Sequence, residues 1–171
     1  MIELKDFIRD VPDFPKPGIV FKDITPLLQD ARAWAQAIEQ MQQRTQALQA
    51  DLLLGIESRG FLFAGALAKQ LGRGLIIARK PGKLPYRSDE VSYDLEYGSN
   101  TLQMHVDAVK PGQRVIIVDD LLATGGTAAA CSRLVGKQRG VVAGYLFCVE
   151  LSFLQGRRQL GDAPVESLLQ Y

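Results

Sequence analysis

The chain has 171 residues, 47% of them hydrophobic and 23% charged, with a formal net charge of +1. This length is sufficient for one domain with a substantial core, and the near-neutral charge gives no general electrostatic basis for binding nucleic acid or a membrane surface. Residues 1–10 lack the apolar core of a signal peptide, and no apolar run approaches the roughly 20 residues of a membrane-spanning helix. We therefore expect a single cytoplasmic domain over residues 1–171. Cys131 and Cys148 should be buried, reduced thiols, because neither belongs to a CxxC pair.

The N-terminal part, about residues 1–28, is expected to form an arm. Residues 1–10 have the composition of a short amphipathic helix, whereas three prolines within residues 12–17 exclude a regular helix or a central strand there. Residues 19–26 should continue as a short strand or loop. The simpler interpretation is a surface arm that packs its own apolar side chains. A stiff arm that carries Val20 and Phe21 could also lie over a flat aromatic ligand.

A helix is predicted after this arm and should end near residues 48–51. Asp30 has the character of an N-cap, and Trp34, Ile38, Met41 and Leu48 follow at helical spacing. We interpret these apolar residues as core.

Two strand–loop units follow, each placing polar residues at the carboxyl end of a strand. Residues 52–56 predict a buried strand and residues 61–71 a helix, so Ser58 and Arg59 between them suit an anion near a helix N-terminus. Residues 75–78 predict the next strand, which ends in RKPGKLP, with three cations in five residues. A solvated loop is the simpler interpretation. Cations that converge at one end of a sheet also suit a pyrophosphate.

Residues 86–100 are polar and could form either a hairpin or a flexible flap over a site. Residues 101–106 alternate between apolar and polar and should form the strand that closes this insertion. Composition alone makes Glu96 a solvated glutamate. His105 is the only histidine, so it supports neither a catalytic triad nor a metal site, and we interpret it as structural.

Residues 115–127, VIIVDDLLATGGT, carry the strongest functional signal. A buried strand is followed by Asp119 and Asp120, a glycine-containing turn, and a predicted helix over residues 127–138 whose end Gly136 leaves open. Backbone N–H groups, threonine hydroxyls and a helix N-terminus suit a phosphate, whereas the two carboxylates suit hydroxyl groups or a metal beside it. A phosphate next to a diol is a sugar phosphate. Neither the P-loop motif nor GxGxxG fits.

The remainder of the chain carries less information. Residues 141–149 predict another buried strand, residues 150–160 a loop or short helix, and the tail has little signal.

The VIIVDDLLATGGT segment resembles the 5-phosphoribosyl 1-pyrophosphate (PRPP) signature of the type I phosphoribosyltransferases. The resemblance extends over nearly the whole chain, through VPDFPKPGIVFKDITPLL (11–28), GIESRGF (55–61), RKPGKLP (79–85), YDLEYG (93–98) and VELSFLQGR (149–157). It implies an α/β fold with a mostly parallel twisted sheet flanked by helices, an N-terminal hood arm and a flap at about residues 80–100. The proline arm, RKPGKLP and LEYG resemble the members that act on adenine.

The resemblance also implies a site. The residues expected at the 5′-phosphate are Ala123, Thr124, Gly125, Gly126 and Thr127, and those at the ribose hydroxyls are Asp119 and Asp120. The residues expected at the pyrophosphate are Ser58, Arg59, Arg79, Lys80 and Lys83. Adenine would be bound by Val20, Phe21, Lys22 and Leu151, with Glu96 as the catalytic acid–base residue. A non-proline cis peptide bond is expected at Glu57–Ser58.

The implied reaction converts adenine and PRPP to AMP and pyrophosphate in purine salvage, in a homodimer, with Mg²⁺ held mainly by PRPP and water. Two alternatives remain. A transferase for xanthine or for hypoxanthine and guanine would share the PRPP signature. A regulator that binds DNA or RNA and senses PRPP would retain the PRPP site but would have lost catalysis. The near-neutral charge and Glu96 argue against this alternative.

Overall fold

The structure is a computed structural model that describes residues 2–94 and 99–171. The chain divides into two compact units, Met1–Gln40 and Met41–Tyr171. Each unit is described by itself.

The N-terminal unit is built around a β-hairpin. A 3₁₀ turn, η1 (Leu4–Phe7), precedes β1 (Arg9–Pro12), which pairs antiparallel with β2 (Val20–Asp23). The helix expected over residues 1–10 is thus limited to one turn, because the strand pairing takes over from residue 9. The proline-rich segment forms the hairpin loop, in which the Phe14–Pro15 bond is cis and the Asp13 carboxylate accepts the Gly18 N–H at 2.7 Å.

Two helices follow the hairpin. The short α1 (Thr25–Gln29) leads into α2 (Ala31–Thr45), which is extended by the 3₁₀ turn η2 (Gln46–Leu48). The Asp30 carboxylate accepts the N–H groups of Arg32 and Ala33, each at 2.9 Å, and so caps α2 as predicted. Ile38, Met41 and Leu48 are buried and Trp34 is half-buried, which confirms most of the predicted apolar face.

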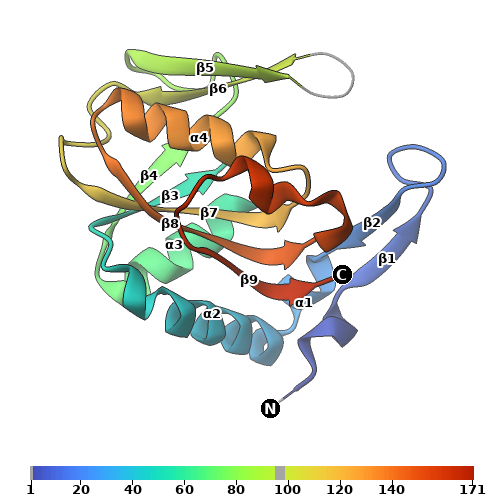
Figure 1. The fold of residues 1–171 in the computed structure, drawn as a ribbon. Coiled ribbons are helices and arrows are strands. Elements are labelled where there is room, and N and C mark those ends of the chain that lie inside the picture. The colour runs from blue at the N-terminus through green and yellow to red at the C-terminus, as the bar shows by residue number, and fades with distance from the viewer. Residues whose placement is uncertain (1, 95–98) are drawn as a thin grey trace. The chain divides into compact units, whose positions relative to one another are not determined.

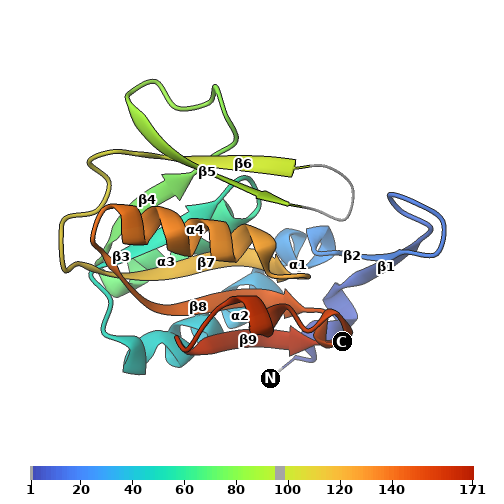
Figure 2. The same cartoon turned by 45° about the horizontal axis from the view of Figure 1, so that its top comes forward.

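The C-terminal unit contains a parallel sheet, which has five strands within the described residues (Figures 1 and 2). The strands are β3 (Leu52–Ile56), β4 (Gly74–Ala78), β7 (Arg114–Leu122), β8 (Val141–Glu150) and β9 (Val165–Gln170), in the order β4-β3-β7-β8-β9. The first four correspond to predicted strands. β9 lies in the tail, for which no element was predicted.

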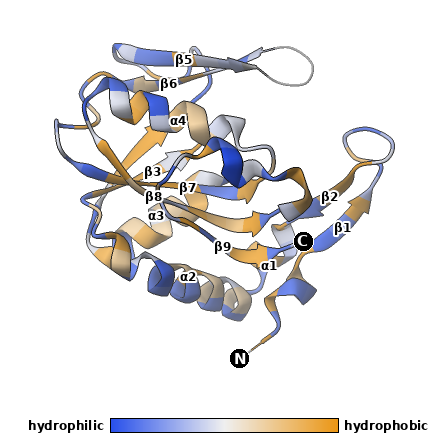
Figure 3. Ribbon diagram, viewed as in Figure 1, coloured by the Kyte–Doolittle hydropathy of each residue, from blue (hydrophilic) through white to orange (hydrophobic). Residues whose placement is uncertain are grey.

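Two crossover helices cover this sheet. α3 (Gly60–Leu71) joins β3 to β4, and α4 (Gly126–Lys137) joins β7 to β8 in the other direction along the sheet. Because parallel crossovers are right-handed, the two helices lie on opposite faces, as Figure 1 shows. The sheet is therefore buried on both sides, which explains the uninterrupted apolar runs of its central strands (Figure 3).

Helix α4 buries one apolar face. Ala128, Cys131 and Val135 are at most 3% exposed, and the helix continues through Gly136 to Lys137. Cys131 and Cys148 are both free and buried, as expected. No helix in the described part of the chain combines the length and the apolar character that crossing a membrane requires.

The polar insertion is a hairpin. β5 (Ser88–Asp94) pairs antiparallel with β6 (Ser99–His105) and packs against α4. Its base is fixed to the end of α4 by Gln138, whose amide donates to the Asp89 carboxylate at 2.9 Å and to the His105 carbonyl at 2.7 Å. The hairpin alternative is therefore confirmed. Glu96 lies outside the described residues.

Candidate active site

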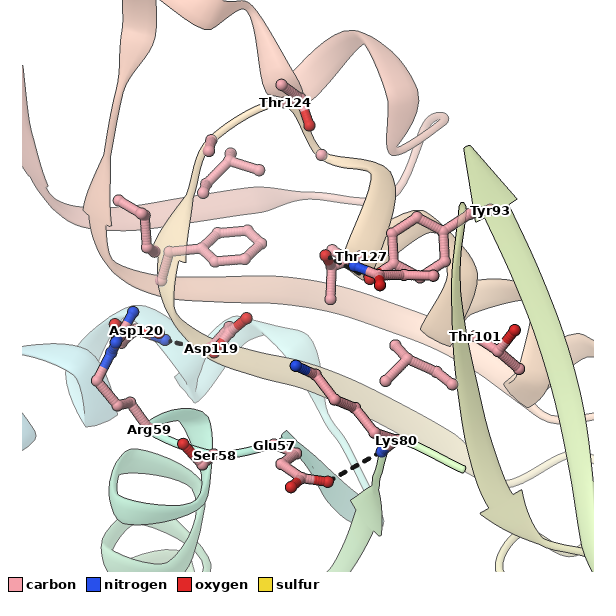
Figure 4. A pocket seen from close by; sticks show the side chains of 18 residues that line it. Glu57, Ser58, Arg59, Lys80, Tyr93, Thr101, Asp119, Asp120, Thr124 and Thr127 are labelled. Carbon is pink, nitrogen blue, oxygen red and sulfur yellow. Dashed lines mark hydrogen bonds and ion pairs between the residues drawn. The ribbon is translucent and has the colours of Figure 1, made fainter. Parts of the chain in front are cut away.

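A cavity of about 420 Å³ lies at the carboxyl ends of the sheet strands (Figure 4). This is the position where open α/β sheets bind ligands. The cavity brings together most of the residues predicted for the sugar phosphate and pyrophosphate, namely Ser58, Arg59, Lys80, Asp119, Asp120, Ala123, Thr124, Gly125 and Thr127.

The predicted phosphate loop runs from the end of β7 into the first turn of α4. Gly125 is the N-cap of α4 and has φ of +88°, a conformation that glycine adopts without the steric cost of a side chain. The N-terminal N–H groups of α4 and its dipole favour an anion here. The hydroxyls of Thr124 and Thr127 lie in the cavity lining beside them. The geometry therefore suits a phosphate.

A second glycine supports this loop from behind. Gly156 lies in the β8–β9 connection, and a methyl group at this position would overlap the Ala123 carbonyl oxygen. A methyl group at Gly125 would in turn overlap the Gly156 carbonyl. The two main chains are therefore in direct contact, and neither position has room for a side chain.

An ion pair holds the β8–β9 connection in place. The Arg157 guanidinium donates to both oxygens of the Glu150 carboxylate at 2.7 Å, and to the Val165 carbonyl at 2.8 Å. Glu150 is 4% exposed and also accepts a short hydrogen bond from the Ser167 hydroxyl. The hydrogen bonds from Arg157, followed by those from Ser167 and Gln170, outweigh burial and lower the pKa of Glu150 below its usual value. No sequence pattern indicated this network.

The acidic pair lies at the end of β7. Asp120 is 6% exposed and forms an ion pair with Arg59, whose Nε lies 2.5 Å from the Asp120 carboxylate, while the Asp120 N–H donates to Asp119 at 2.9 Å. Burial, followed by the neighbouring charge of Asp120, raises the pKa of Asp119 well above its usual range. Arg59 was predicted as a pyrophosphate ligand, and in this structure it also balances the charge of the pair.

Gly60 sets the distance between the loop after β3 and the end of β7. A side-chain carbon at this first residue of α3 would lie 2.8 Å from an Asp119 carboxylate oxygen and 2.9 Å from the Val118 carbonyl. Only glycine therefore permits the start of α3 to approach the end of β7 this closely.

The loop after β3 contacts the loop after β4 through Glu57. Its carboxylate accepts the Lys80 N–H at 2.9 Å and Arg79 Nε at 3.3 Å. Burial alone would raise the pKa of Glu57, but the hydrogen bonds from Lys80 and Arg79 and the charges of Arg79 and Lys83 together lower it. The Glu57–Ser58 peptide bond is cis, as expected. Sequence reasoning assigned Glu57 itself no role.

The three predicted cations of the RKPGKLP loop take different positions. The side chain of Lys80 points into the cavity (Figure 4). Arg79 donates to the Lys83 carbonyl at 3.2 Å and its guanidinium lies 5.9 Å from the centre of the Phe61 ring. Neither Arg79 nor Lys83 is among the described residues that line the cavity.

One wall of the cavity was not foreseen. Tyr93 from β5 and Asn100, Thr101 and Leu102 from β6 contribute to it. The alternation of apolar and polar residues in the strand predicted over residues 101–106 could have indicated this wall. In a strand, alternate side chains point to opposite faces, so the pattern shows which residues share one face of the hairpin.

The residues predicted to bind adenine are divided between the two units. Leu151 follows β8, is half-buried, and donates its N–H to the Leu122 carbonyl at the end of β7, at 2.9 Å. Val20, Phe21 and Lys22 belong to β2 of the N-terminal unit. There the Phe21 ring packs edge-on against Phe14, and Lys22 forms an ion pair of 2.6 Å with Asp10.

The described residues contain no cluster of three or more histidine, cysteine, aspartate or glutamate side chains that could hold a metal ion. Two carboxylates line the predicted sugar-phosphate region, and Arg59 already offsets the charge of one of them. This donor set suits a cation that is bound in part by the phosphates of a ligand.

Known proteins match this chain over most of its length. Residues 21–151 match the family described as the phosphoribosyl transferase domain. An adenine phosphoribosyltransferase from Anaeromyxobacter dehalogenans is 55% identical over 164 residues, which cover 96% of this chain and 95% of that protein.

Solved structures agree with the sequence match. The crystal structure of adenine phosphoribosyltransferase from Thermoanaerobacter pseudethanolicus is 49% identical, with a TM-score of 0.96 and 98% of each chain covered. The enzyme from Saccharomyces cerevisiae, solved with adenine and an imino-altritol bisphosphate, is 39% identical, with a TM-score of 0.91 and coverage of 97% of this chain and 96% of that one. The chain described here therefore belongs to the phosphoribosyltransferase family and, within it, to the adenine phosphoribosyltransferases.

Proposed function

We propose that the chain transfers the 5-phosphoribosyl group of PRPP to adenine and releases AMP and pyrophosphate, a purine salvage reaction. The observation that carries the proposal is the cavity at the carboxyl end of the sheet. There the predicted phosphate loop, at a helix N-terminus, adjoins the acidic pair Asp119 and Asp120. A phosphate site next to carboxylates that accept hydroxyl hydrogen bonds fits a ribose 5-phosphate.

In this proposal the ribose phosphate is held before the chemical step. The loop of residues 123–127 binds the 5′-phosphate, and Asp119 and Asp120 accept hydrogen bonds from the ribose hydroxyls. As N9 of adenine attacks C1 and pyrophosphate leaves, positive charge develops on the ribose. The carboxylate of Asp120, which forms an ion pair with Arg59, stabilises this charge electrostatically.

The departing pyrophosphate carries negative charge that cations can neutralise. We assign this role to the loops after β3 and β4, through Ser58, Arg59, Arg79, Lys80 and Lys83. The Lys80 ammonium already points into the cavity, and Glu57 fixes the backbone on which it sits. Mg²⁺ bound with PRPP would add Lewis-acid stabilisation of the leaving group.

The proposal for adenine rests on the family. Val20, Phe21 and Lys22 would form a hood over the purine with Leu151 on its other side, and Glu96 would exchange a proton with the ring as the base is attached. We also propose that the chain acts in the cytoplasm as a homodimer, with small-molecule substrates and without nucleic-acid or membrane partners.

The test of the proposed function is pyrophosphate release from PRPP and Mg²⁺ with adenine, hypoxanthine, guanine, xanthine, uracil or orotate. We expect release with adenine alone. Release with another base instead would retain the PRPP site and overturn the base assignment. PRPP binding without release for any base would favour a PRPP-sensing regulator, which a nucleic-acid filter-binding assay with and without PRPP would then test.

The substitution Asp120→Asn tests the ribose assignment. It retains the shape of the side chain but removes the charge that faces Arg59 and the ribose. We expect kcat/KM for PRPP to fall about tenfold to 100-fold, because a hydrogen bond to a charged group is worth roughly 1.5–3 kcal/mol. Initial rates at varied PRPP would measure this, with the exposed Asp107→Asn as the matched control. Unchanged kinetics in Asp120→Asn would contradict the assignment.

A further inference from the structure

The hydroxyl of Tyr93 lies 3.0 Å from the hydroxyl of Thr127, and each residue lines the cavity (Figure 4). Tyr93 belongs to β5 of the hairpin, whereas Thr127 is the last residue of the phosphate loop and lies in the first turn of α4. The two residues are 34 positions apart in the sequence. The hairpin therefore contacts the phosphate loop through a specific polar interaction.

The aromatic ring adds a second contact to the same loop. A side-chain carbon at Gly126 would lie 3.3 Å from Cδ2 of Tyr93, so the ring packs directly against the backbone of the first helical residue. Hydroxyl and ring together restrain Gly126 and Thr127, two neighbouring residues at the helix N-terminus.

The direction of the hydrogen bond follows from what each hydroxyl can do. A hydroxyl has one hydrogen to donate and two lone pairs. If Thr127 donates its hydrogen to a phosphate oxygen, its own oxygen can only accept from Tyr93, and the phenol is the more acidic donor of the two. The phenol would then polarise the threonine hydroxyl and hold it in the rotamer that faces the phosphate. Tyr93 and Thr127 are both half-buried, which limits competition from water.

We propose that Tyr93 is a positioning residue for 5′-phosphate recognition, which acts by donating a hydrogen bond to Thr127 and by packing against Gly126. The inference rests on the proposed function, because it takes the 5′-phosphate of PRPP as the ligand of this loop. It assigns Tyr93 to the ribose-phosphate end of the cavity and gives it no part in pyrophosphate binding.

The test is the substitution Tyr93→Phe, which removes the hydroxyl and retains the ring against Gly126. Loss of one such hydrogen bond should raise KM for PRPP about threefold to tenfold and leave kcat nearly unchanged. Competitive inhibition by ribose 5-phosphate should weaken by the same factor, whereas inhibition by pyrophosphate should not change. A residue with a merely structural role would weaken both inhibitors or lower the melting temperature.

A double-mutant cycle with Thr127→Val isolates the pair. Once Thr127 has lost its hydroxyl, Tyr93→Phe should cause little further loss of ribose 5-phosphate binding. The matched control is Tyr86→Phe, an exposed tyrosine that precedes the hairpin, and it should leave both inhibition constants unchanged.

Two outcomes would overturn the inference alone, and a third would overturn it together with the proposed function. Equal effects of Tyr93→Phe in the parent and the Thr127→Val backgrounds would exclude action through Thr127, and an unchanged ribose 5-phosphate constant would exclude any role for the hydroxyl. If the unaltered protein were inhibited by neither ribose 5-phosphate nor pyrophosphate, the proposed function itself would fail and the inference with it.

Discussion

Replacing Gly156 by alanine is expected to lower kcat/KM for PRPP by about two orders of magnitude, although Gly156 is not one of the predicted binding residues. The added methyl group overlaps the Ala123 carbonyl, which belongs to the main chain and cannot rotate away as a side chain would. Either the β8–β9 connection or the phosphate loop must shift by roughly 1 Å, and a misplacement of that size can cost about 10²-fold in rate.

Steady-state kinetics at varied PRPP and a urea titration would separate loop displacement from unfolding. We expect a stability loss of about 1–3 kcal/mol, typical of overpacking. The control is Gly136→Ala, in which the methyl group meets nothing within 4 Å and the residue lies inside α4. The free energy of unfolding of that variant should rise by roughly 0.5–1 kcal/mol, and its kcat/KM for PRPP should not change. Normal kinetics in Gly156→Ala would show that the β8–β9 connection does not hold the phosphate loop in position.

Replacing Arg157 by alanine is expected to destabilise the fold by about 2–3 kcal/mol at neutral pH. The substitution leaves the Glu150 carboxylate, 4% exposed, with its negative charge and without its two hydrogen bonds from Arg157. Removal of one partner of a fully buried pair costs roughly 3–5 kcal/mol, and the partial exposure of Arg157 reduces this figure. Because Gly156 precedes Arg157 directly, kcat/KM for PRPP should fall as well.

The pH dependence of this loss identifies its cause. The pKa of Glu150 is lowered in the folded protein, so its stabilisation is fully present above the usual glutamate value of 4.5 and is lost as the pH falls through the folded pKa. The difference between the parent protein and Arg157→Ala should thus be largest near neutrality and shrink below pH 4.5. Urea titrations across this range would measure it, with the exposed neighbour Arg158→Ala as control. A difference independent of pH would assign the loss to packing.

Local sequence patterns were sufficient for much of the fold. The central strands β3, β7 and β8 are continuous apolar runs, and the Asp30 cap and the spacing of Ile38 and Met41 predicted α2. Such signals lie within a few residues of one another, so a single segment reveals them. The phosphate loop and the acidic pair were predicted for the same reason, since they are contiguous in the chain.

The features that escaped prediction depend on partners far away in the sequence. β9 is recognisable only through its pairing with β8, and Tyr93 acquires its role from a threonine 34 positions later. Gly156 resembles any loop glycine until the Ala123 carbonyl is seen against it. The Arg59–Asp120 ion pair joins residues 61 positions apart, and nothing in either segment indicates it. Each of these features depends on a tertiary contact, which no single segment of the sequence reveals.

The close approach at Gly60 has a consequence for how this scaffold can diversify. The gap between the loop after β3 and the loop after β7 is fixed by main-chain atoms and by the Asp119 carboxylate, so exchanging the other cavity side chains would leave that gap unchanged. Relatives that select a different acceptor could therefore change their base-binding residues and still keep the same donor. A phosphoribosyl donor of different length would instead require a different backbone path at the start of α3, which single substitutions rarely provide.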